Sequence, residues 1–159
     1  MSELHLAYLS LGSNIEPEVN LPKAVKLLSQ HGEFGKISSA WETKPVGGGG
    51  GNYLNACLSY KTPLSRDKLK NEIIHPIESD LGRKRTQDKN APRTIDIDIV
   101  LFDDEIVGRR WLAQVFVVVP LAEIYPDFQN PNTNENIAET ATRLRREFWT
   151  ETRQGVLLG

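Results

Sequence analysis

Two aspartates stand two positions apart in the segment Arg-Thr-Ile-Asp-Ile-Asp-Ile-Val-Leu-Phe, residues 93–102. Apolar residues alternate with the others along this segment, a pattern typical of a β-strand. Successive side chains of a strand point to opposite faces, so Asp96 and Asp98 share a face, with Cα atoms about 7 Å apart. Two carboxylates this close repel each other unless water or cations lie between them. We expect Thr94, Asp96, Asp98 and Val100 on one face and Ile95, Ile97, Ile99 and Leu101 on the other.

Basic residues lie immediately before the acidic pair. Arg93 follows Pro92 at the start of the strand, and the preceding segment contains Arg83, Lys84, Arg85 and Lys89. Alone, such a run is usually an exposed loop, and an isolated Asp-x-Asp is usually a solvated polar face. Together they combine carboxylates that bind Mg²⁺ with cations that bind phosphate. The combination indicates a site for a nucleoside triphosphate.

Bulk composition excludes several other classes of protein. The chain has 159 residues, which suits one domain, and a net charge of −2 gives no overall basic field for nucleic acid. No apolar run is long enough to span a bilayer, and the N-terminus lacks the features of a signal peptide. The single cysteine, Cys57, cannot form an internal disulfide, which favours a reducing cytoplasm. We expect Cys57 to be buried and to pack as a small apolar residue. No P-loop motif is present.

The elements that must position the charged residues follow from hydrophobic periodicity. A turn is expected at residues 12–14, and Pro76 should kink or end the helix that contains it. Five consecutive glycines, residues 47–51, predict a mobile loop, and a further loop is expected at the basic segment 83–92. The order β-α-β-β-α-β predicts an α+β, ferredoxin-like core: a mostly antiparallel sheet with helices packed on it. Expected strands cover residues 4–11, 34–42, 53–61, 93–102 and 115–119, the last ended by Pro120; expected helices cover residues 18–31, about 66–81 after a cap at Ser65, 120–124 and roughly 135–149.

The expected strand at residues 53–61 has one apolar and one mixed face. Leu54, Ala56, Leu58 and Tyr60 alternate along the first, and Tyr53, Asn55 and Cys57 along the second. Asparagine is disfavoured in strands, so a polar partner is expected for Asn55. Trp41 and Trp111 are expected to pack in the core or cover loops, and the three histidines, His5, His31 and His75, lack the spacing of metal ligands.

The chain resembles the 6-hydroxymethyl-dihydropterin pyrophosphokinase family of folate biosynthesis, over about residues 5–128. The Pro-Arg-Thr-aliphatic-Asp-aliphatic-Asp segment is specific, and it is joined here to a Leu-Gly-Ser-Asn segment near the start. The matching pieces are residues 9–14, 41–47, 52–56, 77–78, 81–83, 91–102 and 116–121.

The resemblance implies one pyrophosphokinase domain over residues 1–159, which transfers the β,γ-diphosphate of ATP to the hydroxymethyl group of the dihydropterin and releases AMP. It implies catalytic roles for Asp96, Asp98, Arg83 and Arg93, with two Mg²⁺ ions held by Asp96 and Asp98. Contacts with the co-substrate ATP are implied for Glu78, Arg83, Arg85, Arg93 and Ile99. Contacts with the pterin are implied for Thr43, Pro45, Val46, Tyr53, Asn55 and Phe116. Mobile loops are implied for the glycine run and for residues 83–92.

One stretch departs from the family pattern. Residues 103–115 lack the usual Pro-His segment and contain no histidine, and Gln114 lies where an arginine is common. Two arginines, Arg109 and Arg110, remain in the stretch. The shortened connection leaves open a second hypothesis, a catalytically weakened module of the same fold that binds pterin or nucleotide.

A third hypothesis is an RNA-binding sheet of ferredoxin-like topology, which stacks bases on strand aromatics. The aspartates on the exposed strand face would repel phosphates, so this hypothesis is the weakest. We therefore expect small-molecule partners only, the pterin and ATP, without nucleic acid or membrane, and a monomer in the cytoplasm.

Overall fold

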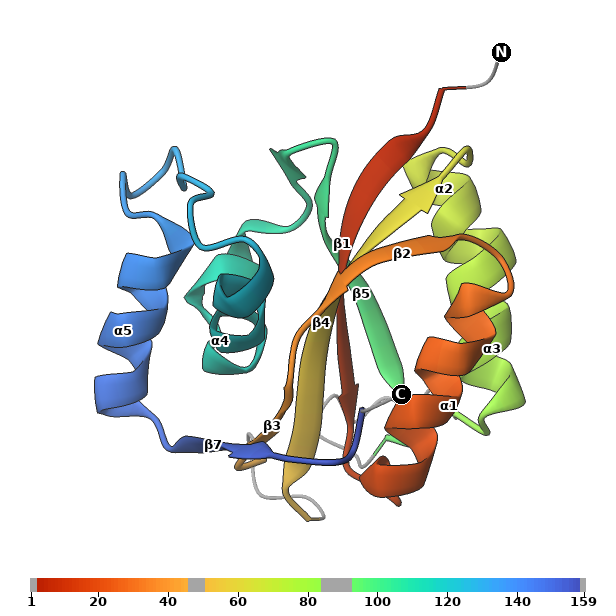
Figure 1. The fold of residues 1–159 in the computed structure, drawn as a ribbon, viewed down its shortest axis with the longest axis horizontal. Coiled ribbons are helices and arrows are strands. Elements are labelled where there is room, and N and C mark those ends of the chain that lie inside the picture. Colours follow the sequence, from red (N-terminus) through yellow and green to blue (C-terminus); the bar gives the residue numbers. More distant parts are fainter. Residues whose placement is uncertain (1–2, 46–50, 84–92, 158–159) are drawn as a thin grey trace.

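The computed structural model describes residues 3–45, 51–83 and 93–157, and within them seven strands form one antiparallel sheet (Figure 1). The order across the sheet is β6-β5-β1-β4-β3-β7, and β2 also pairs with β4. The central strand β1 is thus flanked by β4 and β5. The strands are β1 (His5–Ser13), β2 (Glu33–Ile37), β3 (Ala40–Thr43), β4 (Tyr53–Thr62), β5 (Asp96–Phe102), β6 (Glu105–Ile106) and β7 (Thr150–Arg153).

Helices cover both faces of this sheet. In Figure 1, α1, α2 and α3 lie on one side, and α4 and α5 lie on the other. None of the described helices has the length and apolar character to cross a membrane. The helical elements are α1 (Pro17–Ser29), α2 (Arg66–Lys68), the π-helix η2 (Leu69–Ile74), α3 (His75–Asp80), the 3₁₀-helix η3 (Arg109–Ala113), α4 (Val115–Ile124) and α5 (Ile137–Glu147).

The predicted β-α-β-β-α-β order is confirmed by β1, α1, the pair β2 and β3, β4, α3 and β5. Several boundaries differ from the prediction; the acidic strand, for example, begins at Asp96 and not at Arg93. The expected strand at residues 34–42 is divided into β2 and β3 at Ser38, whose main-chain N–H still donates to the Cys57 carbonyl oxygen but whose hydroxyl, not its carbonyl, accepts the Cys57 N–H at 2.9 Å. The expected turn at residues 12–14 begins later, because Gly12 and Ser13 still pair with β4.

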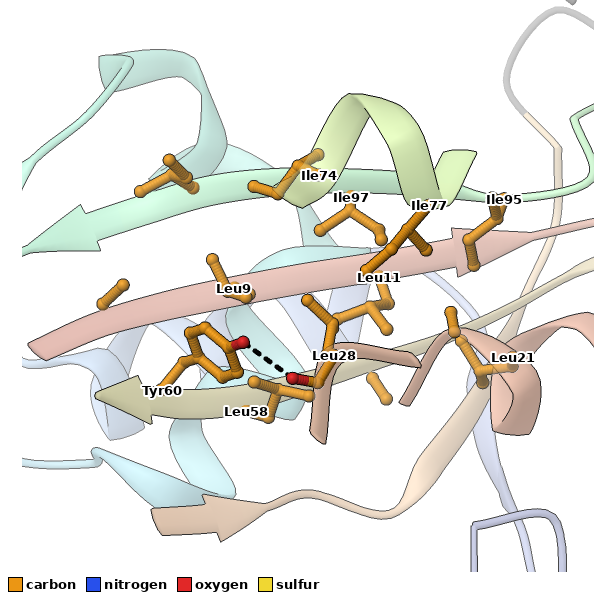
Figure 2. Packing of buried hydrophobic residues seen from close by; sticks show 14 of the residues in the cluster. Leu9, Leu11, Leu21, Leu28, Leu58, Tyr60, Ile74, Ile77, Ile95 and Ile97 are labelled. Atoms are coloured by element: carbon orange, nitrogen blue, oxygen red, sulfur yellow. Dashed lines mark hydrogen bonds between the residues drawn. The ribbon is translucent and has the colours of Figure 1, made fainter. Parts of the chain in front are cut away.

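The first apolar cluster lies between the sheet and helices α1 and α3, and Figure 2 shows its packing. Leu21, Ala24 and Leu28 form the buried stripe of α1. They face alternate residues of β4, which confirms the predicted division of that strand. The Tyr60 hydroxyl, inside this cluster, donates a 2.7 Å hydrogen bond to the Leu28 carbonyl oxygen and so ties the sheet to the end of α1.

The predicted helix at residues 66–81 is continuous but not uniform. Ser65 caps it as expected, since its hydroxyl accepts the Lys68 N–H at 3.3 Å. Pro76 neither ends nor breaks the helix, because the preceding residues 69–74 form a π-helix. A π-turn widens the helix and shifts the hydrogen bonds to a spacing of five, which makes room for the proline ring.

The predicted strand at residues 115–119 is wrong: these residues begin helix α4, and Pro120 lies inside it. Its β-branched run indicated a strand, but the helix is apolar on all sides, as a buried helix must be. Val117, Val118 and Val119 are buried in the second apolar cluster, with residues from the sheet and α5. The predicted short helix at residues 120–124 is the end of the same helix, and the predicted C-terminal helix is confirmed as α5.

Strict alternation along the acidic strand holds only as far as Ile99. Leu9 pairs with Ile99 and Tyr8 pairs with Leu101, so β5 contains a bulge with Val100 as the extra residue. Ile95, Ile97 and Ile99 pack in the first cluster as predicted, but Leu101 joins Val100 in the second. The bulge thus corrects the predicted face of Leu101 and leaves the two aspartates on one face.

Candidate active site

A cavity of about 500 Å³ runs along the end of the sheet and around the outer edge of β5. It receives side chains from the strand face that bears the aspartates, from the helix η2–α3 and from η3. Its lining consists of Ser10, Gly12, Thr43, Lys44, Tyr53, Asn55, Lys70, His75, Glu78, Arg83, Arg93, Asp96, Ile97, Asp98, Arg110, Trp111, Gln114 and Phe116.

A row across three strands forms the floor of this cavity. Gly12 of β1 pairs with Asn55 of β4 on one side and with Asp96 of β5 on the other. A Cβ atom at Gly12 would lie 2.8 Å from the Asn55 side-chain oxygen, so a larger residue here would require the Asn55 side chain to move. The missing side chain leaves space over β1, so the Asn55 amide and the Asp96 carboxylate border one open volume.

The Asp96 carboxylate is shared by two guanidinium groups. Arg83 Nη2 lies 3.3 Å from one oxygen of Asp96, and Arg93 Nη1 lies 3.6 Å from the other. Arg83 also contacts Glu78 at 3.3 Å, and the second oxygen of Glu78 accepts the Ile97 N–H at 2.9 Å. This buried glutamate therefore fixes both Arg83 and the outer edge of β5.

Arg93 is held in place from the start of the chain. Its N–H donates to the Asn14 side-chain oxygen at 2.7 Å, and its carbonyl accepts the N–H groups of Asn14 and Ile15 at 3.1 and 3.2 Å. The turn after β1 thus grips the first residue of the acidic segment. The arrangement explains physically why the Leu-Gly-Ser-Asn and Arg-Thr-Ile-Asp pieces occur together.

Asp98 carries the clearest electrostatic signature in the cavity. Burial, together with the neighbouring carboxylates of Asp96 and Glu78, raises its pKa to about 7, and the nearby charges of Arg83 and Arg110 oppose this rise. A divalent cation between the two aspartates would relieve this penalty, and hard oxygen ligands are those that Mg²⁺ prefers.

The two aspartates fit a magnesium ion that arrives with a phosphate. Within residues 3–45, 51–83 and 93–157, no group of three or more His, Cys, Asp and Glu side chains is arranged to hold a metal ion. Magnesium commonly uses one or two carboxylates and completes its octahedron with substrate phosphates and water. Arg83, whose buried Nε atom has no hydrogen-bond partner, lies beside these carboxylates with donor capacity to spare.

Most of the residues proposed for the pterin line the cavity. Thr43, Tyr53, Asn55 and Phe116 line it, and the Asn55 amide nitrogen donates to the Thr43 hydroxyl at 2.7 Å, which is the polar partner expected for Asn55. Burial raises the pKa of the Tyr53 hydroxyl, with the Arg93 charge in opposition, so this group stays protonated. Pro45 lies outside the lining, and Val46 lies outside the described residues.

The residues proposed for ATP are also brought together, with two exceptions. Glu78, Arg83 and Arg93 line the cavity, whereas Arg85 lies outside the described residues, as do most of the two expected mobile loops. The Ile99 side chain packs in the first apolar cluster instead. A contact between Ile99 and ATP would therefore use its main chain, which faces the same outer edge of β5 as the N–H of Ile97.

Half of the lining residues were not among the site residues proposed from the sequence. Lys70 and His75 are five residues apart, a spacing that aligns side chains only in a π-helix, where the His75 N–H bonds to the Lys70 carbonyl. Trp111 lines the cavity in addition to packing, and Arg110 lines it whereas Arg109 does not. The other additions are Ser10, Gly12, Lys44, Ile97 and Gln114.

Comparisons with known proteins point to one family. The family model described as 7,8-dihydro-6-hydroxymethylpterin-pyrophosphokinase (HPPK) matches residues 8–126. A 2-amino-4-hydroxy-6-hydroxymethyldihydropteridine pyrophosphokinase of Bacillus subtilis is 36% identical over 155 residues, which cover 90% of this chain and 92% of that protein. A relative of the same name from Aquifex aeolicus is 37% identical over 134 residues, covering 78% of this chain and 82% of that protein.

Solved structures show the same fold at low sequence identity. The crystal structure of wild-type Plasmodium falciparum HPPK-DHPS with pteroate superposes with a TM-score of 0.71 at 12% identity and covers 91% of this chain. The superposition covers only 43% of the Plasmodium chain, so the present chain spans less than half of that protein.

Proposed function

We propose that Asp96 and Asp98 hold two Mg²⁺ ions in the reaction of this chain. The chain belongs to the 7,8-dihydro-6-hydroxymethylpterin-pyrophosphokinase family, and it transfers a diphosphoryl group from ATP to 6-hydroxymethyl-7,8-dihydropterin in folate biosynthesis. The single observation that supports this proposal most strongly is the shared face of the two aspartates, bordered by Arg83 and Arg93. When bound, Mg²⁺ would neutralise phosphate charge and help to orient the triphosphate for in-line attack.

The arginines hold the phosphates in this proposal. In the described geometry, Arg83 and Arg93 are paired with Asp96, and Arg83 also with Glu78. Guanidinium groups bind phosphate oxygens in a bidentate manner, so they can transfer from carboxylate to phosphate partners when ATP enters. Such an exchange places positive charge where charge develops in the transition state.

The pterin would occupy the side of the cavity formed by Tyr53, Asn55 and Phe116. The ring faces of Tyr53 and Phe116 suit stacking on a flat heteroaromatic ring. The Asn55 amide, already held by Thr43, can donate and accept along the pterin edge. Because Asn55 and Asp96 flank Gly12 in one row, a pterin at Asn55 would hold its hydroxymethyl group toward the aspartates.

The chemical step then needs position more than covalent help from the protein. The hydroxymethyl oxygen loses its proton to water and bonds to the β-phosphorus, and the bond from that phosphorus to the α-phosphate oxygen breaks, which releases AMP. Phosphoryl transfer depends chiefly on alignment and charge neutralisation, which this cavity offers through fixed carboxylates and guanidiniums.

The test is the release of AMP from ATP in the presence of hydroxymethyl-dihydropterin, with and without Mg²⁺. We expect activity only with Mg²⁺, and a loss of at least about 100-fold in Asp96→Ala and in Asp98→Ala, since each removes a charged group of the reaction centre. Circular dichroism should show that both variants remain folded. Near-wild-type AMP production by either variant would refute the proposed roles.

A weakened binding module remains the second candidate, and the short connection over residues 103–115 favours it. In this structure, Arg110 and Gln114 of that connection still line the cavity. Multiple turnovers in the same AMP assay decide in favour of the enzyme, whereas binding without turnover supports the module.

We further propose that residues 1–159 form one catalytic domain that works as a monomer in the cytoplasm. The 92% coverage of the Bacillus relative supports a single domain, and the buried, unpaired thiol of Cys57 suits a reducing compartment. Light scattering at micromolar concentration checks the monomer; a mass of twice the chain would contradict it.

A further inference from the structure

Trp111 is held in one orientation by a turn built around glycine. Gly108 has a φ of 82°, and its carbonyl accepts the Trp111 N–H at 3.3 Å. A Cβ atom at Gly108 would lie 3.0 Å from the indole atoms Cδ1 and Nε1. Both the backbone conformation and the close contact thus favour glycine, which lets the indole ring lie against the main chain at the cavity wall.

Two neighbours give this indole a role beyond packing. The Trp111 ring meets the Phe116 ring at 73° with centroids 6.4 Å apart, so it stands roughly perpendicular to the proposed pterin-stacking face. The Arg110 guanidinium carbon lies 4.4 Å from the centroid of the Trp111 ring. Trp111 therefore contacts both an aromatic wall of the cavity and one of its cations.

Arg110 is fixed in direction by this contact. An arginine stacked on an indole retains free N–H edges for an anion, while its plane is held by the ring. Arg110 and Asp98 both line the cavity, and the Arg110 charge reaches that carboxylate. Both arginines of the turn are exposed, but only Arg110 lines the cavity, so the turn presents one of its two arginines to the substrate.

Resting on the proposed function, we infer that Trp111 contacts the substrate: its indole closes the pterin end of the cavity beside Phe116 and orients Arg110 toward the phosphates of ATP. This assignment makes Trp111 a specificity residue for the pterin and a positioning residue for Arg110. If Trp111 were purely structural, replacing it would lower the maximal rate through the amount of folded enzyme and would leave the KM for each substrate unchanged.

The experiment separates KM from kcat for each substrate in Arg110→Ala, Trp111→Phe and Trp111→Ala. We expect Arg110→Ala to raise the KM for ATP about 10-fold and to leave the KM for pterin within about twofold, as expected for a lost charge-assisted contact. Trp111→Ala should raise both KM values, the pterin KM by about 3- to 10-fold, and Trp111→Phe should restore most of the pterin KM.

A double variant tests the coupling. If the indole positions Arg110, the effect of Arg110→Ala on the KM for ATP should largely disappear in the Trp111→Ala background, because the two changes remove one interaction. Fluorescence gives a reading independent of catalysis: addition of the pterin should quench the wild-type and Trp149→Phe proteins alike, and quench Trp111→Phe much less.

Arg109→Ala is the matched control, since it removes an arginine from the same turn outside the cavity, and its kinetic constants should equal those of the wild type. The inference would be overturned if the effects of the two changes on the KM for ATP were additive, if the KM values of Trp111→Ala were unchanged, or if Trp111→Phe were fully quenched. Turnover by the wild type would still support the proposed function in each of these cases. A wild-type chain that neither binds nor turns over the substrates would refute both.

Discussion

Asp98 shows how function opposes stability at the scale of one residue. Its carboxyl group lies in the cavity near the carboxylates of Asp96 and Glu78, and burial with these charges raises its pKa to about 7. In the folded chain without metal, the ionised form of the Asp98 carboxyl group is therefore electrostatically unfavourable at neutral pH. A bound cation would offset this cost, because the ionised carboxylate that destabilises the metal-free chain is the form that binds a metal ion.

This penalty predicts a pH-dependent gain of stability in Asp98→Asn, measured without metal. The folded pKa lies above the unfolded value of 3.8, so between these two values the folded chain binds the extra proton, and stability falls as pH rises through the window. Asparagine removes that loss, which is at most about 4 kcal/mol at about 1.4 kcal/mol per pKa unit. Urea titrations at about pH 4 and about pH 8 measure the difference.

The variant and the wild type should differ little at the lower pH, and the variant should be the more stable at the higher pH. The same variant should lose AMP production, because a neutral amide is a poorer Mg²⁺ ligand than a carboxylate. A constant difference at both pH values would show that Asp98 is not strained when ionised.

At the scale of elements, the junction between α1 and β2 depends on one close approach. Gly32 lies against the Tyr60 side chain, and a Cβ atom there would overlap the ring carbon Cζ and the hydroxyl oxygen. Tyr60 is completely buried and its hydroxyl bonds to the end of α1. It has no space to retreat, so the turn can pass beneath β4 only if this position has no side chain.

Gly32→Ala should therefore reduce the free energy of unfolding by about 2 kcal/mol or more, through overpacking and loss of the Tyr60 hydrogen bond. The matched control is Gly51→Ala, where a Cβ atom would meet nothing within 4 Å. Thermal unfolding of both variants measures the effect, and equal melting temperatures would contradict the prediction.

Helix η2–α3 shows a second consequence at this scale. A regular α-helix with Pro76 would kink, and it would not align Lys70 with His75. The helix continues past Pro76 after the π-helix, and both Lys70 and His75 reach the cavity. The local irregularity is therefore part of how the site is assembled.

At the scale of the whole molecule, the cavity is a product of the complete fold. Its lining comes from β1, β3, β4, η2, α3, β5, η3 and α4, which span most of the chain. A ligand in this cavity contacts the folded state only, because the unfolded chain does not bring these residues together. Binding is therefore linked to global stability.

This linkage predicts that a non-hydrolysable ATP analogue with Mg²⁺ raises the melting temperature. At a concentration 100 times the dissociation constant, the gain in stability is about 2.7 kcal/mol. Thermal scans with analogue alone, Mg²⁺ alone and both together measure it. Asp96→Ala should lose the additional gain from Mg²⁺, and an equal response in that variant would argue against the metal role.

Sequence patterns determined what could be decided locally. Alternation placed Asp96 and Asp98 on one face, the capping residue Ser65 marked a helix start, and the motif segments identified the family. The α+β order of elements also followed from periodicity. These properties depend on residues close together in the chain, so short segments of the sequence are enough to predict them.

Only the tertiary structure decided the rest. A run of β-branched residues at α4 became a helix because burial between the sheet and α5 outweighed intrinsic propensity. The bulge at Val100 and the space above Gly12 arise from pairing between segments that are distant in the chain. Long-range contacts of this kind have no periodic signature, which is why Trp111, Lys70 and His75 emerged as cavity residues only in the folded chain.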